Sequence, residues 1–196
     1  MRPLTAQQVQ ALLEARPYRF RVAVLLGAGC GLQIREVLGL PVSAVNLIGR
    51  ELVVSRQRQA LHGQPLTLRP PKSHSSNRTV PLPDVVAAGI VEHLRRWPRA
   101  GGEQDLLVRT VTGRPVWPRT LHSRIWRTAT TDAGLPGVRF HQLRHFYASA
   151  LIRAGESVES VEVALGHASD WRPSRSTSAC GQTTTYAPAP SSMTST

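Results

Sequence analysis

Residues 141–153, His-Gln-Leu-Arg-His-Phe-Tyr-Ala-Ser-Ala-Leu-Ile-Arg, are the most informative stretch of this chain. We expect them to form one helix, which ends at the Ala-Gly pair that follows. On such a helix His141, Arg144 and His145 share one face, while Leu143 turns toward the core. Two histidines and an arginine on one face favour a site that binds an anion and moves protons.

Two other interpretations of this face stay open. His141 and His145 are spaced i and i+4, as a pair of zinc ligands would be, but no glutamate follows His141 and the arginine between them would repel a metal ion. The face could also be a solvated basic surface without a ligand. The anion site fits the residue types best, and we predict no metal ion at these residues.

The composition favours an acidic polymer as the partner. The chain has 196 residues, enough for one ordinary domain, and its 24 basic against 12 acidic residues give a formal charge of +12. Nucleic acid is the common partner of so basic a domain, and a basic surface without function is the alternative. All basic residues except Lys72 are arginine, so this single lysine invites a functional explanation.

Other function classes are disfavoured by what the sequence lacks. No apolar run approaches the length that spans a bilayer, and the first residues lack the apolar stretch of a secretory signal. Two cysteines are too few for a disulfide scaffold or a structural zinc site. We therefore expect a protein of the reducing cytoplasm, with no membrane partner.

Periodicity and capping signals predict a mainly helical α+β domain with a small antiparallel sheet. Residues 69–76, between two of the predicted strands, should form an exposed hairpin tip that carries Lys72. We expect a capping box of Thr5 and Gln8, a breaker at Gly29-Cys30-Gly31, caps at Asp84 and Ser157, and a helix end at Gly166. The expected helices run from Thr5 to Pro17, Phe20 to Ala28, Gln33 to Leu38, Val85 to Trp97, Pro118 to Ala133, His141 to Arg153, and Ser157 to Leu165. The expected strands are 51–55, 64–68 and 77–82, with a short buried strand at 105–108.

The last residues differ in amino-acid composition from the rest of the chain. Residues 170–196 contain no Leu, Ile, Val or Phe, and twelve of these 27 residues are Ser or Thr. Such a segment cannot bury enough apolar surface to fold. We therefore expect a folded domain over 1–169 and a disordered Ser/Thr/Pro-rich tail over 170–196.

Several motifs, taken in order, resemble the tyrosine recombinases, and phage-type integrases of GC-rich bacteria in particular. The resemblance covers about residues 3 to 169 and implies the fold of that family's catalytic domain. It also implies double-stranded DNA as the partner, other integrase subunits as further partners, and a place at the bacterial nucleoid. The matching residues are Gly31-Leu32 with Glu36, Lys72, Arg78-Thr79-Val80-Pro81-Leu82-Pro83, His141 with Arg144-His145, Leu151-Ile152 with Ala154-Gly155, and Leu165-Gly166-His167.

The resemblance implies a reaction and a role for each matching residue. In this family a tyrosine hydroxyl attacks a DNA phosphodiester, which joins the DNA to the enzyme and releases a 5′-hydroxyl, and a second 5′-hydroxyl then reverses the step without a cofactor. By resemblance Lys72 is the general acid, Arg144 stabilises the negative phosphorane-like state, and His141 and His167 flank the phosphate. Lys72, Arg144 and His145 would contact the DNA.

The first departure from the family is at its first catalytic arginine. The family pattern is Gly-Leu-Arg, but the third place here is Gln33, which can donate a hydrogen bond and carries no charge. Arg35 is no obvious substitute, because two residues along a helix turn the side chain by about 200°, to nearly the opposite face. The loss of a charged contact to the transition state typically costs about 10²–10³ in rate.

The second departure is the nucleophile. The window around Ser176 and Thr177, where the family places its tyrosine, holds none. Tyr186 lies nineteen residues past His167, so it would be an unoriented nucleophile. A reading-frame slip near Ser169 would explain this tail, because shifted GC-rich codons can spell a tyrosine at the family position.

A third departure is that the chain begins where the family's catalytic domain begins, so we expect the amino-terminal DNA-clamping domain to be missing. Site-specific DNA recombination by strand exchange is the function that the resemblance implies, with little or no activity expected in this chain. Two alternatives stay open. One is a non-catalytic DNA-binding remnant of an integrase, and the other is a decayed gene product.

Overall fold

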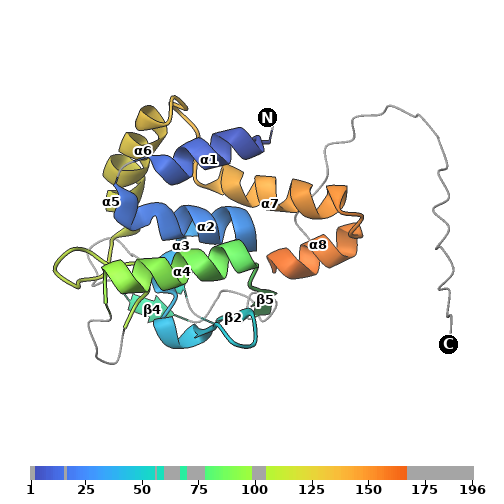
Figure 1. Cartoon of the computed structure of the whole chain (residues 1–196), viewed down its shortest axis with the longest axis horizontal. Helices are drawn as coiled ribbons and strands as arrows, with labels where there is room; N and C mark the ends of the chain where they lie inside the picture. Colours follow the sequence, from blue (N-terminus) through green and yellow to red (C-terminus); the bar gives the residue numbers. More distant parts are fainter. Residues whose placement is uncertain are drawn as a thin grey trace, which may run out of the picture.

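The computed structural model describes residues 3–15, 17–55, 57–59, 67–69, 78–98 and 105–166. It confirms a mainly helical α+β fold with a small antiparallel sheet (Figure 1). The helices are α1 (Ala6–Glu14), α2 (Arg21–Cys30), α3 (Ile34–Gly39), α4 (Asp84–Arg96), α5 (Pro118–Thr120), α6 (Arg127–Asp132), α7 (His141–Arg153) and α8 (Val158–Leu165). Short 3₁₀ turns cover Tyr18–Phe20 and Val42–Ala44, and a π-helical segment covers Leu121–Trp126. The strands are β1 (Val45–Asn46), β2 (Glu51–Val54), β3 (Gln57–Gln59), β4 (Thr67–Arg69) and β5 (Arg78–Pro81).

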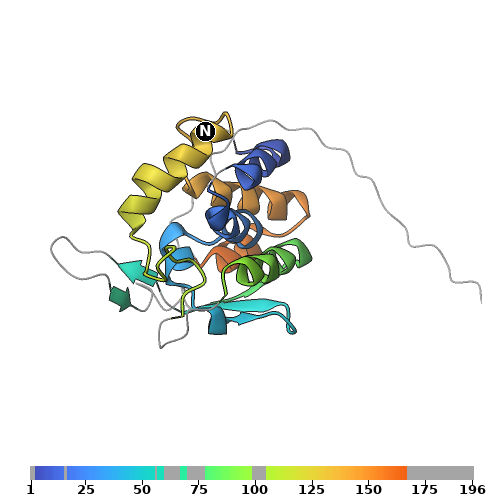
Figure 2. The same cartoon turned by 60° about the vertical axis from the view of Figure 1, so that its left-hand side comes forward.

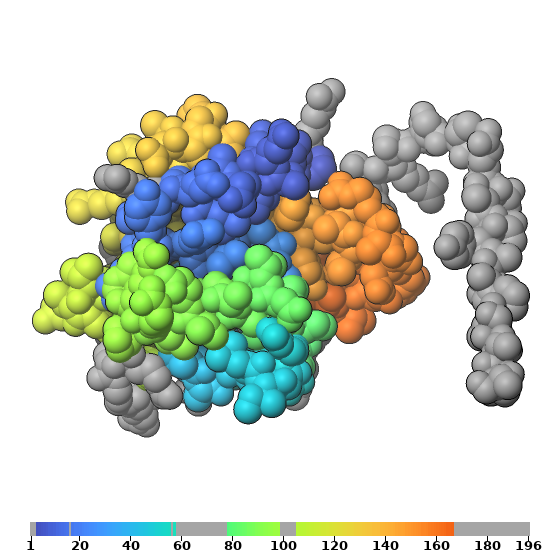
Figure 3. All heavy atoms as spheres, viewed as in Figure 1, coloured from blue at the N-terminus to red at the C-terminus, as the bar shows by residue number. Residues whose placement is uncertain are grey.

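Helix α2 is the centre of the core. It contacts α1, α4 and α7, and Figure 2 shows these three helices around it. Every residue from 22 to 28 is buried, as expected for a helix that is apolar on all sides. On the face seen in Figure 3, α4 lies between α1 and the segment that carries β1 and β2.

Helix α2 ends within the predicted breaker at Gly29-Cys30-Gly31, but two residues later than the predicted end at Ala28. The helix continues through Gly29 to Cys30 and ends at Gly31, whose φ of +65° lies in the left-handed region that glycine favours. A Cβ at position 29 would lie 2.4 Å from Val86 Cγ2. Gly29 therefore allows α4 to approach α2 closely, and this reason cannot be seen in the local sequence.

Of the three predicted residues that cap the start of a helix, two are confirmed and one is wrong. Thr5 and Gln8 form the predicted capping box at α1, and Ser157 Oγ accepts a hydrogen bond from the Ser160 amide at α8. At α4 the cap is Pro83, and Asp84 is the first helical residue rather than the cap.

The strands form two small sheets instead of one. Strands β1, β2 and β5 form an antiparallel sheet in that order, and β3 pairs with β4 in a separate antiparallel ribbon. In the described chain, β4 and β5 therefore belong to different sheets and do not form the predicted hairpin. Lys72 lies between them, outside the described residues.

The predicted strand at 105–108 is buried as expected but is not a regular strand. Leu106 forms an isolated bridge with Pro41, and the Leu107 amide donates to the Leu40 carbonyl at 2.9 Å. The predicted helix from Pro118 consists of α5, the π-helical segment and α6 in direct succession. Within the described ranges, no helix has both the length and the apolar character needed to cross a membrane.

Candidate functional site

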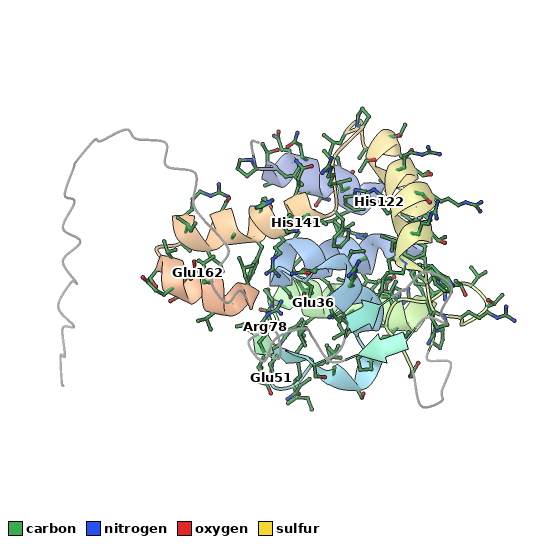
Figure 4. The ribbon with its side chains drawn as sticks, turned by 180° about the vertical axis from the view of Figure 1, so that it is seen from behind. Glu36, Glu51, Arg78, His122, His141 and Glu162 are labelled. Atoms are coloured by element: carbon green, nitrogen blue, oxygen red, sulfur yellow. The ribbon has the colours of Figure 1, made fainter. Side chains whose placement is uncertain are left out.

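A buried ion pair joins α3 to β5. Arg78 Nη1 donates to Glu36 Oε1 at 2.8 Å, Nη2 donates to Glu36 Oε2 at 3.2 Å, and the two side chains are only 7% and 6% exposed (Figure 4). Arg78 Nε also donates to the Ala164 carbonyl of α8 at 2.9 Å. The backbone N–H of Gln33 donates to Glu36 Oε2 at 2.7 Å. This pair therefore holds α3, β5 and α8 together, although they are far apart in the sequence.

Arg144 is buried, which argues against the alternative of a wholly solvated basic face. Its side chain lies one helical turn from His141, yet the residue is only 2% exposed. Nη1 donates to the Gly31 carbonyl at 2.8 Å, and Nη2 donates to the Leu165 carbonyl. Burial lowers the pKa of Arg144 to about 10 against the opposing effect of Glu36, so the guanidinium stays charged at neutral pH.

The two histidines of α7 are exposed, in contrast to Arg144. The rings of His141 and His145 meet edge to face, with 4.6 Å between their centroids. Partial burial, and then the nearby Arg144 charge, lower the pKa of His145. Leu143 is fully buried, as predicted. Among the described residues, no group of three or more His, Cys, Asp or Glu side chains is placed to hold a metal ion.

A surface pocket of about 290 Å³ opens beside His141. Its lining also contains Gln33, Ile34 and Arg35 from the start of α3, and Gln57 from β3. Gln33 is the cap of α3 and has extended backbone angles (φ −74°, ψ 154°). The helical rotation between positions 33 and 35 therefore does not apply, and both residues line the same pocket.

Of the predicted site residues, the structure describes Gln33, His141, Arg144 and His145. It places Gln33 and His141 in one pocket, with His145 against His141 and Arg144 buried on the same helix. Lys72, His167 and Tyr186 lie outside the described residues, so their roles stay predictions.

Sequence reasoning assigned no role to Glu36 or Arg78, although both belong to the motif matches that it found. Their partnership depends on a contact across 42 positions, which spacing alone cannot reveal. Burial raises the pKa of the nearby Cys30 thiol to about 12 and also raises the pKa of Tyr147, so both groups favour their protonated forms at neutral pH. Tyr147 packs against the small core between α7 and α8, as expected of a core residue.

The chain is similar to known recombinases over most of its length. Tyrosine recombinase XerA of Pyrococcus furiosus is 29% identical over 173 residues, which cover 85% of this chain and 53% of that protein. The integrase of Mycobacterium phage D29 is 27% identical over 166 residues, which cover 84% of this chain and 44% of the phage protein. The chain thus spans about half the length of the curated relatives it matches.

Solved structures show the same fold. The Tn1549 transposon integrase, in complex with transposon right end DNA, has a TM-score of 0.74 at 21% identity, with 85% of this chain and 58% of that one covered. A crystal structure of XerA recombinase has a TM-score of 0.69 at 22% identity, with 86% and 55% covered. The model of the phage integrase family matches residues 2–172. This chain therefore belongs to the phage integrase family of tyrosine recombinases.

Proposed function

We propose that this chain is a DNA-binding domain for site-specific recombination by tyrosine-mediated strand exchange, and that it cleaves DNA weakly or not at all. Its place of action is the bacterial nucleoid. The observation that carries the proposal is the charged Arg144, fixed by two carbonyls one helical turn from the pocket that His141 lines. The names of the relatives support it, since they are called integrases and tyrosine recombinases.

The chemistry of the pocket suits a backbone phosphate. Arg35, His141 and His145 present exposed nitrogen donors on one side of the domain. The chain carries a formal charge of +12, and duplex DNA is a dense linear anion. Contacts to phosphate oxygens from arginine and histidine would position the duplex without reading its sequence.

Weak cleavage follows from two residues. Gln33 stands where the family has its first catalytic arginine, and an uncharged amide stabilises a phosphorane-like state less than a guanidinium does. No tyrosine stands at the family position near Ser176, and Tyr186 belongs to the proposed Ser/Thr/Pro-rich tail after the 1–169 domain. Without an oriented nucleophile, the covalent step loses most of its rate.

Covalent capture tests both parts of the proposal. The full chain is incubated with a library of nicked duplexes of varied sequence, and protein-linked DNA is collected after treatment with SDS. We expect duplex binding that weakens as salt rises and no SDS-resistant adduct. An adduct that disappears in Tyr186→Phe would show that the chain is active. Failure of the wild type to bind any duplex at low salt would refute the recombination function itself.

Gene sequencing tests the proposed frame slip. We propose that the codons after Ser169 are read out of frame. A gained or lost base in that stretch, followed by a restored tyrosine codon near Ser176, is the expected result. An unchanged reading frame would contradict the slip, and the missing nucleophile would then be a property of the chain itself.

A further inference from the structure

We propose that Arg35 is the residue through which the pocket beside α3 and α7 holds a DNA phosphate, in place of a cation at position 33. This inference rests on the proposed function, because it names the residue that contacts the duplex in the same site. It also reverses the expectation from helical periodicity, which set Arg35 apart from the site.

The backbone at the start of α3 brings positions 33 and 35 to one opening. Gln33 precedes the helix with an extended conformation, so its side chain is not placed by the helical repeat. The backbone N–H of Gln33 donates a hydrogen bond to Glu36 Oε2 at 2.7 Å, and Arg78 in turn holds the Glu36 carboxylate. The wall that carries Gln33 and Arg35 is therefore anchored to the buried ion pair.

The charge of Arg35 is available to a ligand, unlike the charges of the buried Arg78 and Arg144. Arg78 is paired with Glu36, and Arg144 donates to two backbone carbonyls, so both guanidiniums already have protein partners. Arg35 is exposed, and in the described part of the chain no carboxylate forms an ion pair with it. Among the described residues that line this pocket, Arg35 is the arginine, and the others are Gln33, Ile34, Gln57 and His141.

Among the anionic groups of biological polymers, a DNA phosphodiester suits the hydrogen-bond donors of this pocket best. Arginine presents a planar set of N–H donors that matches two phosphate oxygens, and its charge does not depend on pH in the physiological range. His141 lines the same pocket and can donate a further hydrogen bond. The phosphate of a duplex would thus be held from α3 on one side and from α7 on the other.

The test is the salt dependence of DNA binding by the full chain. Fluorescence anisotropy with a labelled duplex of arbitrary sequence gives the dissociation constant at several salt concentrations. In Arg35→Gln we expect binding weakened about tenfold and the slope of log K against log salt reduced by about one. Arg153→Gln is the matched control, because Arg153 is exposed at the far end of α7 and does not line the pocket.

A charge swap provides the second arm. The double variant Gln33→Arg with Arg35→Gln moves the cation to the other side chain of the same wall, and we expect wild-type slope and affinity. An Arg35→Gln variant that binds as the Arg153→Gln control does would overturn the inference while DNA binding stands. A double variant as weak as Arg35→Gln would also overturn it. Absence of wild-type binding would instead refute the proposed function, and the inference with it.

Discussion

Two buried arginine–carboxylate pairs in this domain have the same chemistry but different surroundings. Arg78–Glu36 and Arg109–Asp105 have side chains that are 6–7% exposed, with N–O distances of 2.8 and 3.0 Å. A burial measurement or a charge count cannot tell them apart. What differs is the region that each pair supports, because Glu36 also accepts a hydrogen bond from the backbone N–H of Gln33, which lines the pocket beside His141.

The Arg109–Asp105 pair supports a different region, the segment that follows α4, and neither residue lines the pocket beside α3. Arg109 also donates to the Trp97 carbonyl at 3.1 Å and to the Pro98 carbonyl, which fixes the residues after α4. Arg19 lies over the Trp97 ring at 5.3 Å. A buried ion pair therefore indicates structure by itself, and it bears on function only where it positions residues of the candidate site.

Breaking each pair should have the largest effect. We expect Glu36→Ala and Asp105→Ala each to lower the free energy of unfolding by about 3–5 kcal/mol, because each leaves a buried guanidinium unpaired. Urea unfolding followed by circular dichroism measures this. DNA affinity, measured where both variants are folded, should fall only in Glu36→Ala. An equal loss of affinity in the two variants would remove the distinction between the pairs.

A second prediction concerns the carbonyl that holds Arg144. A Cβ on Gly31 would lie 2.5 Å from Tyr147 Cδ1, and the residue has a φ of +65°. Gly134 has a similar φ of +70°, but a Cβ there would meet no atom within 4 Å.

We expect Gly134→Ala to cost about 1 kcal/mol from backbone strain alone, and Gly31→Ala to cost about 2–4 kcal/mol from strain plus overpacking. Thermal unfolding of the two variants measures the difference. Equal losses of stability would mean that Tyr147 moves aside without cost, and that the end of α2 packs less tightly against α7 than the contact with Tyr147 indicates.

The smallest predicted effect is a pH dependence at the Arg109 end of the fold. Burial, opposed by the hydrogen bond to the Leu107 carbonyl, lowers the pKa of His93, which also lies near Arg19 and Arg109. The unfolded chain therefore binds a proton more readily, so the contribution of His93 to stability is complete above about pH 6.5 and is lost as the pH falls below it.

Urea unfolding between about pH 7.5 and 5.5 tests this prediction. Wild-type stability should fall with pH, and the fall should be smaller in His93→Gln, which keeps a donor for the Leu107 carbonyl. His145→Gln serves as the comparison, because the pKa of His145 is lowered in the same direction. An unchanged slope in His93→Gln would show that the pKa of His93 does not differ between the folded and the unfolded chain.

The sequence predicted those parts of the fold that depend on neighbours in the chain. The Thr5–Gln8 capping box and the Gly166 helix end are local signals, and both are confirmed. The end of α2 was predicted too early because Gly29 does not end the helix there. Its role, close packing against Val86, depends on another helix. The rotation of about 200° expected between positions 33 and 35 does not apply, because Gln33 is the cap of α3 and not a helical residue.

The site was predicted in its residue types more than in its geometry. The motif at 141–145 led to the right helix, and His141 lies at the pocket. The burial of Arg144 could not be predicted, because its carbonyl partners are 113 and 21 positions away in the chain. The Glu36–Arg78 pair depends in the same way on β5 reaching α3.

Hydrogen exchange of the wild-type chain, with and without duplex DNA, tests the central claim most directly. If the pocket beside α3 and α7 holds the DNA, the amides at 33–36 and 140–145 should exchange more slowly with DNA present, while those at 105–109 should not change. Protection at 105–109 without protection at 33–36 and 140–145 would contradict the claim. DNA binding that leaves all of these amides unchanged would contradict it as well.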